Sequence, residues 1–413
     1  KQPSKAFIKR VTEGTIEKQI TIDYVLNSCS KTPVSKMKPL IRNLLRLSVY
    51  QLLFMDSVPD SAVCNEAVKL AGKRGFRNLQ GFVNGVLRTL VREKENLPVP
   101  DKKDDVKYVS ITYSVPEWLS KLIIEQYGKE SAEKIFASFL EARPLTIRTN
   151  LSKTTPEELE KELEEAGVKV EKGNYLPYAF TISNLNYLGK IAAFRQGKFA
   201  VQDESSQLAV AIADINEGDF VLDVCAAPGG KTFHAADRLK GAGKVLSRDL
   251  TEYKTELIEE NKDRMHYENV EVQQWDALEE DESLLESVDV LLADLPCSGL
   301  GIMGRKNDIK YQMTEEQLGE LAALQRQILS VVWKYVKPGG QMIFSTCTLN
   351  KGENAENIKW IEENTPLHLV SIEEYLPQNL KNRTGSQGYL QLIPGEDTCD
   401  GFFISKFKRP EAK

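Results

Sequence analysis

Hydrophobic residues in the first hundred positions recur with the period of an α-helix. One stripe comprises Ile41, Leu44, Leu45, Val49, Leu52 and Leu53, and a second comprises Val83, Val86, Leu87, Leu90 and Val91. Because residues three and four apart share one face of a helix, both stripes predict helices that bury one side. We therefore expect an all-α bundle over residues 1–96, followed by a linker over residues 97–108 that contains prolines and then charges.

The pattern changes after the linker. Helical stretches alternate with short extended ones, such as the alternating segment 145–149 and a helix that begins at Thr155-Pro156 and ends at Gly167. This order predicts a small α+β domain over residues 109–196.

From residue 197 onward, short apolar runs alternate with helical stretches of 10–20 residues. The strand candidates are 219–224, 244–249, 270–275, 288–293 and 340–346. Alternation of this kind is typical of βαβ units, whose strands pair in parallel. We expect residues 197–413 to form an α/β, doubly wound, Rossmann-like domain, so that the whole chain is a multidomain protein.

Composition narrows the class of protein. Hydrophobic residues make up 41% of the chain and charged residues 28%, as in ordinary globular proteins, and the sequence has no apolar run long enough to span a membrane. The six cysteines are widely spaced and there are three histidines, so we expect neither a disulfide framework nor a metal site. We expect a cytoplasmic protein. Because the chain does not begin with Met, we also expect the helical domain to be incomplete at its N-terminus.

Charge is distributed unevenly along the chain. Residues 1–100 contain 17 Lys and Arg against 8 Asp and Glu, although the whole chain has a net charge of −6. A basic helical domain suits a polyanionic partner such as RNA, but a solvated helical surface accounts for the same excess. Charge alone leaves both interpretations open.

A glycine turn follows the first strand of the third domain. Strand 219–224 leads into Cys225–Thr232, which reads Cys-Ala-Ala-Pro-Gly-Gly-Lys-Thr, and a helix then begins. Glycines allow close approach of a ligand, and a helix N-terminus favours a carboxylate or a phosphate. Asp249 and Asp276 end the next two strands, where carboxylates can bind ribose and adenine. These features indicate S-adenosylmethionine, with NAD as the rival ligand.

Two cysteines lie at the ends of the last two strands. Cys297 follows Asp294-Leu295-Pro296, and Cys347 lies in Ser345-Thr346-Cys347-Thr348. A free cysteine at a strand end is more often a packed residue than a nucleophile. These two differ because each is expected at the ligand-binding edge of the sheet with polar neighbours.

These motifs, in this order, resemble those of the RNA cytosine-C5 methyltransferases. The first domain, through Leu45–Leu53 and Gly81–Arg88, resembles the NusB-like RNA-binding domain. The combination resembles the RsmB (Sun/Fmu) family of bacterial 16S rRNA methyltransferases. The likeness is dense over residues 197–407 and looser over residues 109–196.

The resemblance implies a role for each motif. Cys347 would attack C6 of cytosine, Cys297 would act in the release steps, and Asp294 would bind the base near the cofactor. The residues implied to bind S-adenosylmethionine are Cys225, Ala226, Ala227, Pro228, Gly229, Gly230, Lys231, Asp249, Asp276 and Asp294. The resemblance also implies that Arg305 and Lys306 contact RNA, and we add Arg143, Arg148 and Lys198 as further candidates.

The expected partner is 16S rRNA or a partly assembled small subunit, bound by a monomer without a metal or a membrane. Two alternatives remain at this stage. The chain could methylate cytosine in tRNA, which the NusB-like segment argues against. It could also be a non-catalytic RNA-binding assembly factor that has kept the fold, which the presence of both Cys297 and Cys347 argues against.

Overall fold

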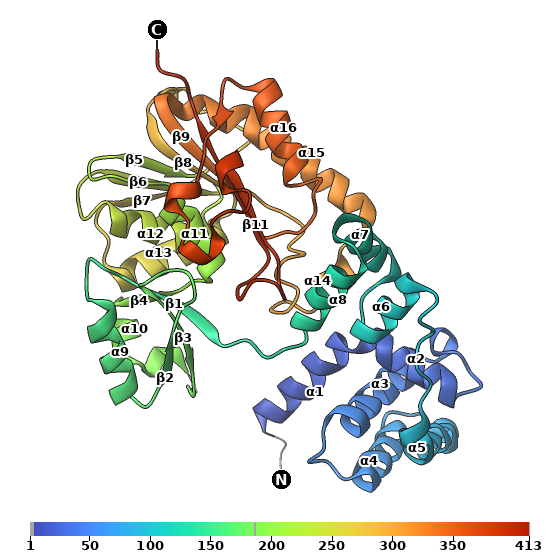
Figure 1. Ribbon diagram of the computed structural model, residues 1–413. Coiled ribbons are helices and arrows are strands. Elements are labelled where there is room, and N and C mark those ends of the chain that lie inside the picture. The colour runs from blue at the N-terminus through green and yellow to red at the C-terminus, as the bar shows by residue number, and fades with distance from the viewer. Residues whose placement is uncertain (1–3, 186, 413) are drawn as a thin grey trace. The chain divides into compact units, whose positions relative to one another are not determined.

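The computed structural model describes residues 4–185 and 187–412. The chain divides into two compact units, each described here by itself (Figure 1). The first comprises residues up to Leu140 together with the later segment Met303–Gln312, and the second comprises the rest of the described chain. None of the helices within the described residues is long and apolar enough to cross a membrane.

The first unit is helical, as the periodic stripes predict. Its core is formed by side chains such as Ile22, Leu26, Leu45 and Leu87, none of which is exposed. Burying such stripes against one another is what stabilises helices of this length. The helices are α1 (Lys5–Glu17), α2 (Gln19–Cys29), α3 (Pro39–Phe54), α4 (Asp60–Lys73), α5 (Gln80–Glu93), α6 (Asp105–Tyr113), α7 (Glu117–Tyr127), α8 (Lys129–Ser138) and the short α14 (Ile309–Gln312).

The expected middle domain, residues 109–196, is shared between the two units. Helices α6, α7 and α8 belong to the helical unit, where Val109, Leu119, Ile123 and Ile135 are fully buried. Helix α6 begins at Asp105, inside the expected linker, and Asp104 caps it by accepting from the amide of Lys107. The burial of these apolar side chains joins residues 105–140 to the bundle.

The remainder of the middle region forms a small antiparallel sheet in the second unit, in the order β2-β3-β1-β4. Helices α9 (Pro156–Glu165) and α10 (Ala192–Arg195) accompany it, and Thr155 and Glu158 form a capping box at the start of α9. The strands are β1 (Leu145–Thr149), β2 (Lys169–Lys172), β3 (Ala179–Ser183) and β4 (Phe199–Val201). An apolar core that includes Ile147, Leu163 and Phe180 holds this α+β layer together.

The main sheet has the order β10-β12-β9-β8-β5-β6-β7, and β11 pairs with β12. Strands β5 to β9 pair in parallel, whereas β12 runs antiparallel to β9 and adds an edge that the sequence pattern did not predict. The strands are β5 (Phe220–Asp223), β6 (Lys244–Asp249), β7 (Val270–Gln274), β8 (Val288–Asp294), β9 (Val336–Thr346), β10 (His368–Leu369), β11 (Tyr389–Leu392) and β12 (Phe402–Lys408).

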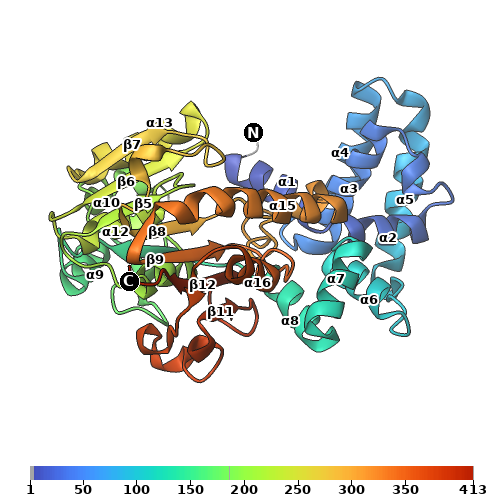
Figure 2. The same cartoon turned by 90° about the horizontal axis from the view of Figure 1, so that it is seen from above.

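Helices cover both faces of this sheet, which confirms the doubly wound architecture (Figures 1 and 2). Successive residues of a strand point to opposite faces, so Val221 belongs to one core and Leu222 to the other. The first core is shared with α11 (Glu204–Ile212), α12 (Gly230–Arg238) and α13 (Glu252–Met265). The second is shared with α15 (Glu315–Val332) and α16 (Ala355–Asn364).

Strand order reverses beside β5, because β6 and β7 lie on one side of it and β8 and β9 on the other. In open α/β sheets, ligands bind at the carboxyl ends of the strands at such a reversal. The fold therefore places a ligand-binding crevice where β5 and β8 end.

Candidate active site

The predicted site residues meet at the carboxyl edge of the main sheet. A cavity of about 390 Å³ is lined by residues that follow or end five different strands. They include Cys225 after β5, Asp249 at the end of β6, Asp276 after β7, Asp294 at the end of β8, and Cys297 and Cys347 after β8 and β9. The structure thus brings together residues that lie more than a hundred positions apart in the chain.

The glycine turn forms one wall. Gly229 has φ of 100°, a left-handed conformation that side chains other than glycine rarely adopt, and a Cβ there would lie 2.3 Å from the ring of Phe233. The turn delivers Gly230 to the first position of α12. A second cavity, of about 180 Å³, is lined by Ala226–Pro228, Gly230 and Lys231 and also by Asp294. The turn therefore faces a cavity beside a helix N-terminus, where an anionic ligand group is favoured.

Asp294 lines both cavities. Its Oδ2 accepts a hydrogen bond from Lys231 Nζ at 2.6 Å, and its Oδ1 accepts one from Ser345 Oγ at 2.8 Å. The side chain of Lys231 is 10% exposed and that of Asp294 is 28% exposed. This ion pair fixes a carboxylate at the meeting point of the two cavities, within reach of groups bound in either.

The two other predicted acids differ in their surroundings. Asp249 is buried. Its carboxylate accepts hydrogen bonds from the backbone amides of Ala227 and Leu250 and from Lys254 Nζ, at 2.8–2.9 Å. Asp276 is half-buried and accepts from the amide of Leu278. Both line the larger cavity, so each can offer carboxylate oxygens to a ligand there.

The two thiols lie side by side, with their Sγ atoms 3.2 Å apart and without a disulfide. The hydrogen bond with Cys347 raises the pKa of the Cys297 thiol well above its ordinary value, and burial and the nearby negative charges of Cys347 and Glu353 raise it further. Cys297 is therefore held as a protonated thiol next to the sulfur of Cys347. Such a pair can present one nucleophilic sulfur and one proton-bearing sulfur to a ligand.

Sequence reasoning missed two features of the site. Asp223, at the end of β5, lines the smaller cavity, and its Oδ1 is buried without a hydrogen-bond partner, whereas its Oδ2 accepts from Thr232 Oγ1. Burial raises the pKa of this carboxyl to about 7. The signal was present in the sequence, because an acid at the end of the first parallel strand faces the same edge as the glycine turn. The second feature is the buried Glu353, which contacts the residues that follow both cysteines.

Comparisons with known proteins identify the family. Residues 1–92 match the NusB family, residues 115–186 match the ferredoxin-like domain of RsmF/B-like methyltransferases, and residues 210–408 match the 16S rRNA methyltransferase RsmB/F family. The chain is 36% identical to a probable ribosomal RNA small subunit methyltransferase B of Bacillus subtilis, over 98% of the chain and 91% of that relative. The chain belongs to the ribosomal RNA small subunit methyltransferase B family.

Other relatives agree with this assignment. A Synechocystis protein described as a probable ribosomal RNA small subunit methyltransferase B is 30% identical over 98% of the chain and 92% of that protein. Among solved structures, PH0851 is 27% identical with a TM-score of 0.82, covering 98% of the chain and 90% of that structure. NSun6 from Pyrococcus horikoshii, solved with SFG, is 22% identical with a TM-score of 0.63, covering 72% of the chain and 99% of that structure, and shares the fold.

Members of this methyltransferase B family depend on S-adenosylmethionine, and the residues of the site fit that cofactor. The larger cavity offers the carboxylates of Asp249 and Asp276 and the ring of Trp275. The Arg248 guanidinium also contacts this ring, 4.5 Å from its centre. The smaller cavity offers the unpartnered oxygen of Asp223, an acceptor suited to an ammonium group. The larger cavity thus has side chains that complement the adenosine part of the cofactor, and the smaller cavity has side chains that complement its amino-acid part.

The candidate RNA contacts differ in exposure. Arg148 has no exposed surface: it pairs with Asp237 and donates to Gln202 Oε1, so the expectation that it contacts RNA is wrong for this conformation. The backbone geometry of β1 points this side chain into the domain, which its sequence position did not reveal. Lys198 is partly exposed and pairs with Glu162 at 2.6 Å. Arg143 is also partly exposed and donates to the carbonyl of Cys399 and to Asp400.

Arg305 and Lys306 are exposed on the segment Met303–Gln312, which packs within the helical unit. In this segment, Lys310 is buried and donates to the carbonyl of Glu17 at 2.8 Å, and Tyr311 Oη lies 3.2 Å from Ser114 Oγ. The chain that follows the Cys297 motif therefore presents its two basic residues from a segment anchored to α1 and to the end of α6.

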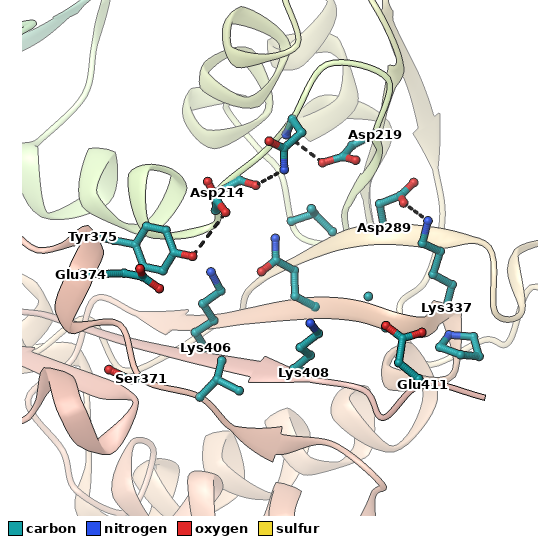
Figure 3. Close-up of a pocket in the computed structure, with 17 residues that line it drawn as sticks. Asp214, Asp219, Asp289, Lys337, Ser371, Glu374, Tyr375, Lys406, Lys408 and Glu411 are labelled. Atoms are coloured by element: carbon teal, nitrogen blue, oxygen red, sulfur yellow. Dashed lines mark hydrogen bonds and ion pairs between the residues drawn. The ribbon is translucent and has the colours of Figure 1, made fainter. Parts of the chain in front are cut away.

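A further cavity, of about 620 Å³, lies at the opposite edge of the main sheet, where β8 and β9 begin (Figure 3). Its charged side chains contact one another: Asp289 pairs with Lys337, and Tyr375 Oη donates to Asp214. No cysteine is among the described residues that line it. Apart from Gly229, the predicted cofactor-binding residues and both thiols line the cavities at the carboxyl edge and not this one.

Proposed function

We propose that this methyltransferase transfers the methyl group of S-adenosylmethionine to C5 of a cytosine in 16S rRNA through a covalent bond between Cys347 and C6 of the base. The observation that carries this proposal is the pair of thiols 3.2 Å apart in the wall of the cofactor cavity, close to Asp294. Methylation of an exocyclic amine or a ribose hydroxyl needs no sulfur nucleophile. Methylation of C5 does, because this carbon is not nucleophilic in the intact aromatic base.

In the first step, the Cys347 thiolate adds to C6 and the ring electrons move to C5, which becomes an enamine-like carbon. S-adenosylmethionine would supply the electrophilic methyl group that C5 takes up, and its sulfur would leave as the uncharged thioether of S-adenosylhomocysteine. Asp294 contacts the N3 and amino edge of the base and supports protonation there, while the hydrogen bond from Lys231 orients the Asp294 carboxylate. Splitting one difficult substitution into addition and elimination is what covalent catalysis contributes.

In the second step, C5 loses its proton and the bond between Cys347 and C6 breaks. Once Cys347 is part of the adduct, its sulfur is an uncharged thioether. The largest cause of the raised pKa of Cys297, which is its hydrogen bond with Cys347, is then removed. Cys297 then releases its proton to water, takes the proton from C5, and the C6–S electrons return to Cys347. The cycle restores both sulfurs and releases one proton overall.

Binding of the cofactor uses the chain's own acids. We assign Asp249 to the ribose hydroxyls, Asp276 to the adenine edge and Asp223 to the ammonium group, because each offers carboxylate oxygens to one of the two cavities. The helix N-terminus at Gly230 favours the carboxylate. The two parts of the ligand would thus meet near Asp294.

The assignment to small-subunit rRNA is supported by the relatives, which are described as ribosomal RNA small subunit methyltransferases. Because a stacked cytosine cannot reach a thiol in the wall of a cavity, the target base must be single-stranded or turned out of its stack. We propose that Arg305 and Lys306, which are exposed and follow the Cys297 motif in the chain, contact phosphates of the RNA.

A methyl-transfer assay tests this function. The wild-type protein and the Cys347→Ala variant are incubated with labelled S-adenosylmethionine and unmodified 16S rRNA, with tRNA run in parallel, and 5-methylcytidine is mapped. We expect label at one cytosine of 16S rRNA with the wild type and at least a thousandfold less with the variant, with unchanged cofactor affinity. Label only in tRNA would overturn the substrate, and label retained by the variant would overturn the mechanism.

A further inference from the structure

The two loops that bear the thiols are joined by the residues that follow each cysteine. Ser298 follows Cys297, Thr348 follows Cys347, and their hydroxyl oxygens lie 2.7 Å apart. Both residues are buried. The separation of the two sulfurs is therefore fixed by a second contact, one residue further along each loop.

Glu353 accepts hydrogen bonds from both loops although none of its surface is exposed. Its Oε2 accepts from the amide of Ser298 at 2.9 Å and from Gln325 Nε2 at 3.0 Å. Its Oε1 accepts from Ser298 Oγ at 2.5 Å, from Asn350 Nδ2 at 3.1 Å and, at 3.5 Å, from Thr348 Oγ1. All these donors are uncharged. A buried carboxylate is costly, and several donors are needed to offset its desolvation.

The same network holds the residues that precede each cysteine. Gln325 also donates to the carbonyl of Pro296 at 2.9 Å. Asn354, next to Glu353, accepts from Thr346 Oγ1 at 2.6 Å and donates to the carbonyl of Thr348 at 3.0 Å. The residues before and after each cysteine are thus connected to Glu353 and Asn354 and to α15.

The charge of Glu353 acts on the nearer thiol. A negative group beside a thiol disfavours its ionised form. The hydrogen bond with Cys347 and burial are the larger causes of the raised pKa of Cys297, and the charges of Cys347 and Glu353 follow. The other ionisable groups lining the cavity are Cys225, Asp249, Lys254, Asp276 and Asp294, most of which add negative charge when ionised.

We propose that Glu353 is a positioning residue that holds the two thiols at their separation and keeps Cys297 protonated until Cys347 has become part of the adduct. This inference rests on the proposed function and deepens it, because it explains how two adjacent thiols take different roles. Two ionised sulfurs 3.2 Å apart would repel each other. The hydrogen bond with Cys347 and burial disfavour that state most, and the Glu353 carboxylate beside Cys297 adds to them.

The Glu353→Gln variant separates charge from connectivity. A glutamine has the same shape, and the hydroxyls of Ser298 and Thr348 and the carboxamide of Asn350 can reorient to accept from its amide group. Glu356→Gln is the matched control, because Glu356 lies three residues further on, in α16, with a side chain that is 69% exposed. Both changes remove one negative charge from the same region of the chain.

The readout is the rate at which iodoacetamide alkylates Cys297 as a function of pH, followed by peptide mass spectrometry in full-length protein carrying Cys347→Ser. We expect Glu353→Gln to lower the alkylation midpoint by about one pH unit and Glu356→Gln to leave it unchanged. In the protein with both cysteines, Glu353→Gln should lower kcat at least tenfold while KM for S-adenosylmethionine stays within twofold. An unchanged midpoint in folded Glu353→Gln would overturn the proposal.

Should Glu353→Gln fail to fold, the Cys347→Ser protein alone decides the matter. The proposal then requires a Cys297 midpoint above the value of about 8.5 for a free cysteine, and a midpoint at or below it would overturn the proposal. Alkylation does not depend on methyl transfer. A wild-type protein that makes no 5-methylcytidine would therefore defeat the proposed function while leaving the test of Glu353 intact.

Discussion

The two thiols of the site have the same chemical nature and different surroundings. Cys297 has a raised pKa, for which contact with Cys347 is the main cause, and the carboxylate of Glu353 lies on its side of the pair. If Cys297 acts in release, removing its sulfur should stop the reaction after methyl transfer. The division of roles is thus open to a direct test on each residue.

For Cys297→Ala, we expect the RNA to remain covalently bound after methylation, because no sulfur is left beside C5 to take its proton. Denaturing gels with labelled 16S rRNA would show a protein–RNA band that accumulates only when S-adenosylmethionine is present. The matched control is Cys64→Ala, which changes a buried thiol in the helical unit. Normal product release without such a band would contradict the role of Cys297.

Asp223 predicts a pH dependence of cofactor binding. Burial raises the pKa of this carboxyl to about 7, and only its ionised form attracts an ammonium group. Calorimetric titration should therefore show affinity for S-adenosylmethionine falling about tenfold from pH 8 to pH 6. Asp223→Asn should bind more weakly and lose this dependence. An equal slope in wild type and variant would remove Asp223 from the cofactor site.

The same shift has a consequence for stability without cofactor. The folded-state pKa lies above the ordinary value of 3.8, so the unfolded chain loses this proton first as pH rises. The contribution of Asp223 to stability is therefore greatest at low pH and falls as pH rises from about 4 through about 7. An ammonium group bound to the carboxylate opposes this loss.

At the residue scale, the sequence predicts residues that belong to motifs and misses those that act through tertiary contacts. Strand ends identify Asp294, Cys297 and Cys347, and the structure places all three at one cavity. Glu353 belongs to no spacing pattern, since its partners come from loops and a helix that meet only in the fold. Arg148 was predicted to contact RNA and is buried instead, because the sequence of a short strand does not show which face a basic residue occupies.

At the scale of elements, the strand β5, the glycine turn and α12 form the unit that shapes the cofactor cavities. Gly229→Ala should destabilise the protein, because φ of 100° costs a residue with a Cβ about 1–2 kcal/mol and the added atom would meet Phe233. Gly230→Ala is the matched control, since a Cβ there would lie 3.7 Å from Gln202, an ordinary contact.

Thermal unfolding followed by circular dichroism measures the difference. We expect Gly229→Ala to lower Tm by several degrees, at about 2–4 °C per kcal/mol, and Gly230→Ala to leave it within about one degree. Equal Tm values for the two variants would show that the turn is not strained as the structure indicates.

The sequence predicts the elements of the parallel sheet well, because the central strands β5 and β8 contain short, buried apolar runs. Predicted strand 244–249 coincides with β6, and predicted strand 288–293 differs from β8 by one residue. The antiparallel edge at β12 was missed, since pairing direction depends on a partner far along the chain. The contacts group helices α6–α8 with the helical unit, although α7 and α8 lie within residues 115–186, which match the ferredoxin-like domain, and a buried helix face does not by itself show what covers it.

At the scale of the whole molecule, we expect RNA binding to depend on the exposed basic segment next to the Cys297 motif. We expect the Arg305→Ala/Lys306→Ala double variant to bind 16S rRNA more weakly. The slope of the logarithm of the binding constant against the logarithm of the salt concentration should become shallower by about 0.7–0.9 for each phosphate that the protein no longer neutralises. Filter binding at several salt concentrations measures both. The control Lys161→Ala/Lys359→Ala removes two lysines whose side chains are more than three-quarters exposed, and should change neither.

The fold class follows from sequence periodicity, and the basic part of the chain coincides with residues 1–92, which match the NusB family. Equal salt slopes for the Arg305 and Lys306 variant and its control would assign RNA binding to other residues. The net charge of −6 could not have decided this, because binding depends on where basic residues gather and not on their total.

The central claim is that Cys347 bonds to the target cytosine. The most direct measurement is mass spectrometry of the adduct formed with a 16S rRNA fragment that carries 5-fluorocytidine at the mapped position, since fluorine at C5 cannot leave as a proton does. The account predicts one RNA-linked peptide, attached through Cys347 and carrying the transferred methyl group. Attachment through Cys297, or 5-methylcytidine formation on normal RNA without any adduct on the fluorinated one, would contradict it.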